Sequence, residues 1–203
     1  TRNSIALTQA HLGTYHEHMP AESPAPPGRA AEILYAMLKP PPDVAAAIDA
    51  LRRRCAIPAG YGRDRLHVTV RPLGDIGGLE GGARGRLSAA LAAIEIDMAP
   101  FRLALDRLDG KALIVGEGAR AVAALRRAIE AGLAAHGELP APDRFDNRPH
   151  LSLDYRGPRG AVRRIAPIVW TVRGARLVGS LHGRGVHVDH GCIPFRPRQL
   201  ALL

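Results

Sequence analysis

One strand–helix–strand pattern occurs twice in this chain, and the repetition restricts the fold more than any other feature of the sequence. The first unit predicts a strand over ILYAML (33–38), a helix, and a strand that begins with HVTV (67–70). The second predicts a strand over ALIV (112–115), a helix, and a strand that begins with HLSL (150–153). Units of nearly equal length with the same element order indicate an internal duplication. We therefore expect two related lobes, packed face to face, with the histidine-bearing strands side by side across a central groove.

The hydrophobic periodicity of the chain predicts three main helices among short strands, which makes the fold class α+β. Asp43 is the expected cap of the first helix, and the third helix is expected to run over 120–136 and to stop at Gly137. Asp109-Gly110 is a typical hairpin dipeptide between two predicted strands. The apolar stripes of the three helices consist of Val44, Ile48, Leu51 and Cys55, of Leu87, Leu91 and Ile94, and of Val122, Leu125, Ile129 and Leu133.

The composition is that of a soluble globular protein, with 46% hydrophobic residues in a chain of 203, long enough for one domain with a substantial core. No apolar run approaches the ~20 residues of a transmembrane helix, and the amino end lacks the apolar core of a secretion signal. Cys55 and Cys192 are too isolated to form a disulfide framework. These features predict a protein of the reducing cytoplasm with no membrane contact.

The segment 1–30 ends in a proline-rich stretch, PAESPAPPGRA, which cannot hold regular structure. We interpret it as an amino-terminal extension, followed by a single bilobal domain over 31–203. The extension contains His11, His16 and His18, which are more typical of a solvated tail than of a metal site.

A net charge of +9 and a pI near 10.7 predict attraction to polyanions, among which RNA and nucleotides are the obvious candidates. Only Lys39 and Lys111 of the 28 basic residues are lysines. Arginine binds phosphate through two parallel hydrogen bonds and stacks on bases, so its excess fits such a partner. A genome-wide arginine bias explains the composition equally well, so the charge alone does not decide the function.

The alternation of side chains along a strand gives both histidine motifs the same geometry. His67 and Thr69 point to one face of their strand, and His150 and Ser152 repeat the arrangement, while apolar residues anchor the opposite faces. Two imidazoles with pKa values of about 6.5 suit acid–base catalysis at neutral pH, and the hydroxyls suit hydrogen bonds to phosphate oxygens. The set predicts in-line opening of a phosphodiester without a metal ion. Two structural histidines bonded to neighbouring hydroxyls are the alternative interpretation.

Through the segments LYAMLKPPPDV, RLHVTVRPLGD, NRPHLSLDYR and WTVRGARLVGSLHGRG, the chain resembles the two-histidine (2H) phosphoesterase superfamily. Within it, the chain is similar to the LigT-like RNA 2′,3′-cyclic phosphodiesterases, also known as 2′-5′ RNA ligases. The resemblance extends from Ala31 to about Arg196. It implies a bilobal α+β fold whose pseudo-twofold related lobes enclose a central groove. It also implies metal-independent hydrolysis of the 2′,3′-cyclic phosphate termini of RNA or nucleotides to 2′-phosphomonoesters, with no cofactor and no obligate protein partner.

The resemblance assigns a role to each of the four motif residues. It implies that His67 is the general acid for the leaving oxygen and that His150 is the base that positions water. It implies that Thr69 and Ser152 hold the phosphate.

Two departures from the family pattern bear on substrate choice more than on catalysis. Many relatives carry arginine five residues after the second histidine, where this chain has Tyr155 followed by Arg156. In the first motif, Arg71 and Pro72 replace the commoner small and aromatic residues. We therefore expect Arg71, Tyr155 and Arg156 as candidate substrate contacts. Candidates for stacking on a base, by their proximity to the motifs, are Tyr155, Phe145 and Tyr35.

Two further motifs have simpler interpretations than a ligand site. GEGARA (116–121) resembles a dinucleotide-binding turn, but the chain lacks serial βαβ units, so a turn before a helix start is the simpler interpretation. The cluster of His182, His187, Asp189 and His190 is a candidate metal site, against the alternative of a solvent-facing polar strand.

Three functions stay open on the sequence. The first is hydrolysis of cyclic phosphates, and the second is ligation, which joins a 2′,3′-cyclic phosphate to a 5′-hydroxyl by reverse transesterification. The third is a nucleotide- or RNA-binding module without turnover on the same fold. Two complete histidine motifs argue against the third, because a binding module needs no acid–base pair.

Overall fold

The computed structural model describes residues 31–58, 62–79, 81–137, 148–154, 160–181 and 184–197, and the predicted extension over 1–30 lies outside them. The strands are β1 (Glu32–Leu38), β2 (Val68–Asp75), β3 (Phe101–Leu108), β4 (Ala112–Val115), β5 (His150–Ser152), β6 (Arg163–Val172), β7 (Gly174–Leu181) and β8 (Val186–Pro194). The helices are α1 (Pro42–Arg54), α2 (Gly81–Ala93) and α3 (Ala119–Ala135), with a short 3₁₀ helix, η1, over Arg63–Arg65. None of these helices has both the length and the apolar character that crossing a membrane requires.

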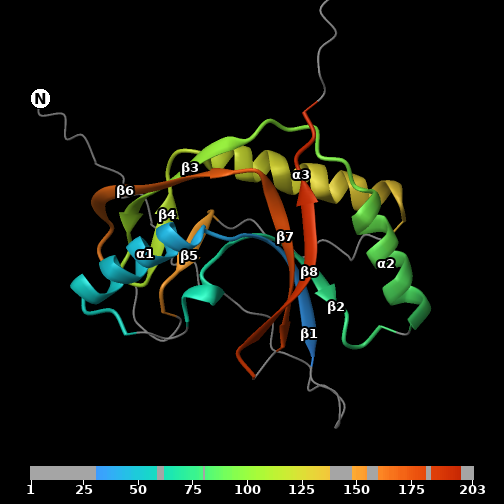
Figure 1. The fold of residues 1–203 in the computed structure, drawn as a ribbon, viewed down its shortest axis with the longest axis horizontal. Coiled ribbons are helices and arrows are strands. Elements are labelled where there is room, and N and C mark those ends of the chain that lie inside the picture. The colour runs from blue at the N-terminus through green and yellow to red at the C-terminus, as the bar shows by residue number, and fades with distance from the viewer. Residues whose placement is uncertain are drawn as a thin grey trace, which may run out of the picture.

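The eight strands of the described residues form one sheet in the order β6-β3-β4-β5-β2-β1-β7-β8 (Figure 1). Neighbouring strands are antiparallel throughout. The two repeated units supply the four central strands, which are arranged symmetrically about the boundary between β5 and β2. The last two strands of the chain, β7 and β8, return to the side of the first unit. The predicted α+β fold of two related halves with neighbouring histidine strands is confirmed.

The two halves join edge to edge, and the expectation that they pack face to face is wrong. Val68 of β2 pairs with Leu151 of β5, so one continuous sheet runs through both halves. Each half on its own would present a strand edge with unpaired backbone groups. Pairing the two edges satisfies these groups, which face-to-face packing of two separate sheets leaves open.

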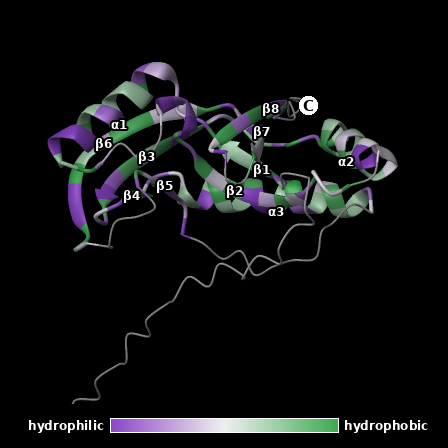
Figure 2. Cartoon of the chain, turned by 90° about the horizontal axis from the view of Figure 1, so that it is seen from below, coloured by the Kyte–Doolittle hydropathy of each residue, from purple (hydrophilic) through white to green (hydrophobic). Residues whose placement is uncertain are grey.

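Two of the three α-helices of the described residues, α1 and α3, pack on a strand of the opposite half. α1 follows β1 but contacts β6, and α3 follows β4 but contacts β2 (Figure 2). The predicted apolar stripe of α3 is buried, with Val122, Leu125, Ile129 and Leu133 at most 1% exposed. The stripe of α1 is also buried except for Cys55, which is half-buried because it lies just beyond the last residue of the helix.

The start of α1 differs from the predicted cap. The helix begins at Pro42, Pro41 occupies the N-cap position, and no side chain caps the helix. Proline fits there because the first N–H groups of a helix have no partner within it. Asp43 lies in the first turn instead, where its carboxylate interacts favourably with the positive end of the helix dipole.

The GEGARA segment forms the turn that opens α3. Gly118 has a φ of +88°, and a β-carbon at this position would lie 2.7 Å from the carbonyl oxygen of Arg102, so only glycine fits. The helix ends just before Gly137, whose φ of +71° makes it the predicted stop. Because β4 is antiparallel to both of its neighbours, β3 and β5, the turn is a helix start and lacks the parallel strand pairing of a dinucleotide site.

Candidate active site

One residue pair, Val68 with Leu151, sets the register between the two histidine strands. Both side chains point into the core and are 0% exposed. Because side chains alternate faces along each strand, the residues before and after this pair point to the opposite face of the sheet. That face therefore carries all four polar residues of the two motifs, and each of them is partly exposed.

Within this set, each histidine lies across from a hydroxyl residue of the other strand. The antiparallel register places His67 across from Ser152 and Thr69 across from His150. The two histidines are diagonal neighbours, and such neighbours lie about 7–8 Å apart, with their β-carbons somewhat closer. The register thus puts one hydroxyl residue beside each histidine on this face.

Both imidazoles are held by the same kind of hydrogen bond. Nδ1 of His67 donates to the carbonyl oxygen of Arg65 over 2.7 Å, and Nδ1 of His150 donates to the carbonyl oxygen of Arg148 over 2.9 Å. A neutral imidazole that carries its proton on Nδ1 has its lone pair on Nε2. Each ring therefore has Nε2 available for proton transfer, and the duplication extends to the bonds that orient the rings.

The two rings lie within electrostatic reach of each other. The pKa of His67 is lowered from 6.5 to about 4, mainly because burial disfavours the charged ring. Positive charge at His187, Lys39 and His150 also lowers this pKa, while the hydrogen bond to the Arg65 carbonyl opposes the shift. In the protein without substrate, His67 is therefore neutral at pH 7.

Lys39 and His187 are two site residues whose position was not predicted from the sequence. The rings of His187 and His67 meet edge to face, with their centroids 5.5 Å apart. Nζ of Lys39 donates to the carbonyl oxygen of Asp64 and lies 3.4 Å from Nδ1 of His187. Burial, and then the charge of Lys39, lowers the pKa of His187 to about 4. The alternation of Tyr35, Met37 and Lys39 along β1 is the sequence signal that places this lysine on the face of the motifs.

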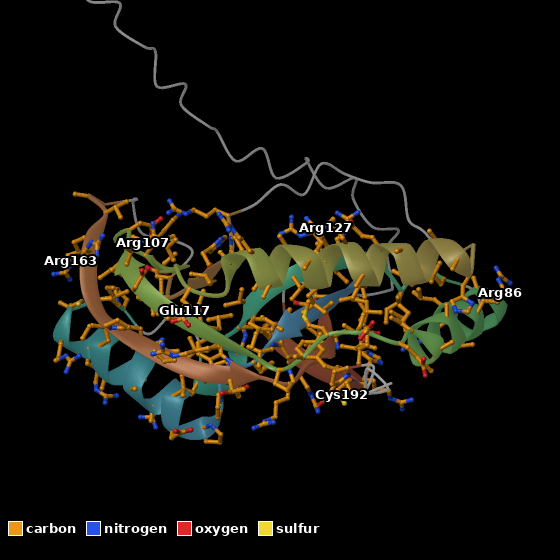
Figure 3. The ribbon with its side chains drawn as sticks, turned by 90° about the horizontal axis from the view of Figure 1, so that it is seen from above. Arg86, Arg107, Glu117, Arg127, Arg163 and Cys192 are labelled. Atoms are coloured by element: carbon orange, nitrogen blue, oxygen red, sulfur yellow. The ribbon has the colours of Figure 1, made fainter. Side chains whose placement is uncertain are left out.

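A hollow of about 630 Å³ opens beside His67, between the end of β1 and the strands β7 and β8. Cys192, which Figure 3 labels, marks its β8 wall. Burial lowers the pKa of Lys39 at the base of the hollow, while the nearby Asp64 carboxylate opposes this shift. The residues whose chemistry bears on the site are Lys39, Asp64, Arg173, Arg176, His187 and Asp189.

A β-bulge separates Arg71 from the motif residues. Thr69 lies across from Met37 of β1, but Arg71 lies across from the next residue, Ala36, so Val70 is an extra residue on β2. Strict alternation would place Arg71 on the same face as Thr69. The extra residue moves it to the opposite face, which the helices cover.

On that face Arg71 is bound to α3. It is 5% exposed, and its Nε lies 3.1 Å from Oε1 of Glu130. Nε of Arg126, also on α3, donates to the carbonyl oxygen of Val70 in the bulge over 3.0 Å. The structure therefore does not bring Arg71 to the site, contrary to its prediction as a substrate contact, because the bulge and these two α3 side chains hold it on the helix side.

The other candidate contacts divide between described and undescribed residues. Tyr155, Arg156 and Phe145 lie outside the described residues. Tyr35 lies across from Val178 of β7, which lines the hollow. Tyr35, the predicted stacking residue among those that the structure describes, thus lies at the side of the hollow.

The candidate metal cluster near the carboxyl end is divided among separate interactions. His182 lies outside the described residues, His187 contacts the first histidine motif, and Asp189 pairs with an arginine of β7. Nε2 of His190 lies 2.7 Å from Oε1 of Glu32. Across the part of the chain that the structure describes, no three histidine, cysteine or acidic residues gather as metal ligands do.

Comparisons with known proteins agree with this fold. A family model described as the 2′-5′ RNA ligase superfamily matches residues 40–184. The structure of E. coli LigT complexed with ATP is similar, with a TM-score of 0.61, 18% identity, and coverage of 81% of this chain and 98% of that one. The structure of TT0787 from Thermus thermophilus gives a TM-score of 0.59 and 19% identity, with coverage of 82% and 100%. No curated protein matches the sequence.

Proposed function

Because the chain belongs to the 2′-5′ RNA ligase superfamily, we propose that it hydrolyses the 2′,3′-cyclic phosphate termini of RNA or nucleotides to 2′-phosphomonoesters. The observation that carries the proposal is the matched pair of histidines on one sheet face. Each ring has its Nδ1 bound to a backbone carbonyl and its Nε2 available for a proton. Hydrolysis of a cyclic phosphodiester requires one group that takes a proton from water and one that gives a proton to the leaving oxygen.

In the proposed reaction, His150 takes a proton from water as the water oxygen attacks phosphorus. The bond between phosphorus and O3′ breaks, and His67 gives its proton to O3′, which leaves the phosphate on O2′. Thr69 and Ser152 donate hydrogen bonds to the non-bridging oxygens, where negative charge builds in the transition state. Since His67 is neutral in the free protein, the bound phosphate anion has to favour its charged form before the step.

The solved relatives support a nucleotide as the substrate class. E. coli LigT has been crystallised with ATP, 3′-AMP, phosphate and NADP⁺, which contain a phosphate group alone or joined to a nucleoside. The net charge of +9 favours the same kind of partner.

Product analysis tests the proposal directly. The protein is incubated with the four nucleoside 2′,3′-cyclic phosphates in excess chelator, and the products are separated as 2′- and 3′-phosphates. We expect 2′-phosphates, with a rate that the chelator leaves unchanged. A 3′-phosphate product would contradict the proposal that the bond to O3′ breaks. If the chelator abolished activity and a divalent ion restored it, the reaction would depend on a metal ion.

Ligation is the second candidate, since the matched family model is named for it. A 5′-hydroxyl then replaces water as the nucleophile, and the same two histidines transfer the protons. A labelled oligonucleotide with a free 5′-hydroxyl, added to the same reactions, distinguishes the two activities. A joined 2′-5′ product in place of the 2′-phosphate would establish ligation, and binding without either product would establish a module without turnover.

A further inference from the structure

The hollow beside His67 extends the candidate site in one direction along the sheet. Its walls come from the end of β1 and from β7 and β8, and its volume of about 630 Å³ lies within the range of small-molecule sites. His187 lines it and also contacts the ring of His67. A ligand that reacts between the two histidines therefore reaches into the hollow without a change in the fold.

Three cations and two carboxylates line the hollow, and one of the carboxylates is fully engaged. Oδ2 of Asp189 accepts from Nη2 of Arg176, and its Oδ1 accepts from the backbone N–H of Gly191 over 2.8 Å. Asp189 thereby orients the guanidinium and occupies one of its five N–H donors, which leaves donors for an anion. Arg173 adds a charge that no acidic group within the described residues pairs with.

Lys39 connects the hollow to the reacting centre. Leu38 pairs with Val68, so continuing the register by one residue places Lys39 beside His67. Nζ of Lys39 lies 3.4 Å from Nδ1 of His187, and the lysine charge lowers the pKa of both His187 and His67. A row of positive charge thus runs from the first histidine motif into the hollow.

Resting on the proposed function, we infer that the hollow binds a phosphate on the 5′ oxygen of the reacting nucleotide, with Lys39, Arg173 and Arg176 as its partners. A terminal 2′,3′-cyclic nucleotide continues into an RNA chain only through its 5′ oxygen. The phosphate there is the anion nearest to the reacting phosphorus, one sugar away. It is either the monoester of a 5′-phosphorylated nucleotide or the diester that joins the preceding residue of an RNA.

Three substrates with the same terminal base test the inference. They are a nucleoside 2′,3′-cyclic phosphate, its 5′-phosphorylated form, and a dinucleotide that ends in the same cyclic phosphate. We expect kcat/KM to be at least about tenfold higher for one or both substrates that carry a 5′ phosphate. A gain for the dinucleotide alone identifies the diester as the ligand, and a gain for both identifies the phosphate itself.

Equal kcat/KM values for the three substrates would overturn the inference and leave the proposed function standing. No hydrolysis of any of the three would overturn the proposed function itself. The two failures are therefore distinguishable in one set of assays.

Variants locate the effect in the hollow. Arg176→Met and Arg173→Met are each expected to bring the ratio of kcat/KM, with against without the 5′ phosphate, down toward one. The matched control is Arg102→Met, an exposed arginine that pairs with Glu117 over 2.9 Å in the other half. Figure 3 shows Glu117 well separated from Cys192 at the hollow. Because the readout is a ratio, partial loss of folded protein cancels, and an unchanged ratio in both hollow variants would refute the assignment.

Discussion

His67 and His150 occupy matching positions in the two halves, and each donates its Nδ1–H to the carbonyl oxygen two residues earlier. Their neighbours across the sheet differ. The register places Ile114 of β4 beside His150 and Lys39 at the end of β1 beside His67. The halves thus share the backbone and the orientation of the rings. Burial, and then the charges of His187 and Lys39, lower the pKa of His67. Two equivalent histidines of a duplicated fold can serve as an acid and a base when their surroundings differ.

The strongest test of this comparison removes each ring. His67→Ala and His150→Ala are each expected to lower kcat for a nucleoside 2′,3′-cyclic phosphate by roughly 10²-fold to 10⁴-fold, because each removes one proton transfer. Circular dichroism checks that the fold is intact. His136→Ala, at the exposed end of α3, is the matched control and is expected to have no effect. Turnover at the normal rate in either active-site variant would end the proposal for that residue.

A substrate whose leaving oxygen is replaced by sulfur distinguishes the two roles. A thiolate leaves without a proton, so a 3′-bridging sulfur is expected to restore most of the activity of His67→Ala, on the order of 10²-fold. It is expected to restore little in His150→Ala, where the activation of water is missing. Rescue of His150→Ala alone would mean that His150 is the acid and His67 the base. The low pKa of His67 in the free protein would fit that assignment.

The hydroxyls on the same face are expected to matter less than the rings. Thr69→Ala and Ser152→Ala each remove one hydrogen bond to a phosphate oxygen and should lower kcat/KM by about tenfold to 100-fold. Thr69→Ser and Ser152→Thr keep the hydroxyl and serve as controls. A loss equal to that of the histidine variants would mean that the hydroxyls take part in proton transfer.

The smallest expected effect concerns the lysine that makes the two halves unequal. A positive charge near His67 disfavours its charged form, so Lys39→Met is expected to raise the pKa of His67. The limb of the kcat/KM–pH profile near pH 4 should then move to higher pH, by roughly half a unit. Lys111→Met, which changes the other lysine, is expected to leave the limb in place. A shift to lower pH would contradict the electrostatic coupling.

The layout of the motifs could be predicted from the sequence because it depends on local alternation. His67 and Thr69 share a face, as do His150 and Ser152, through nothing more than the period of a strand. The duplication predicted that the two histidine strands, β2 and β5, lie next to each other. These two signals were enough to bring all four motif residues together.

The remaining errors come from contacts between distant segments. The bulge at Val70, which turns Arg71 away, depends on pairing with β1 and on Arg126 of α3. His187 reaches His67 only because β8 pairs with β7 and β7 with β1. Neither arrangement produces a periodic pattern or a characteristic spacing in the sequence, because the partner residues come from separate strands and helices.

The exchange of helices between the halves has a consequence for how this chain acquires its structure. α1 contacts β6 and α3 contacts β2, so each of these helices packs against a strand that the other half supplies. A fragment that ends after α2 would lack β6, on which α1 packs, and β7, which pairs with β1, and would expose to water the apolar residues that these strands cover. Folding is therefore expected to be slow and all-or-none, dominated by contacts between residues far apart in the chain. A polypeptide truncated after α2 is therefore expected to stay unfolded.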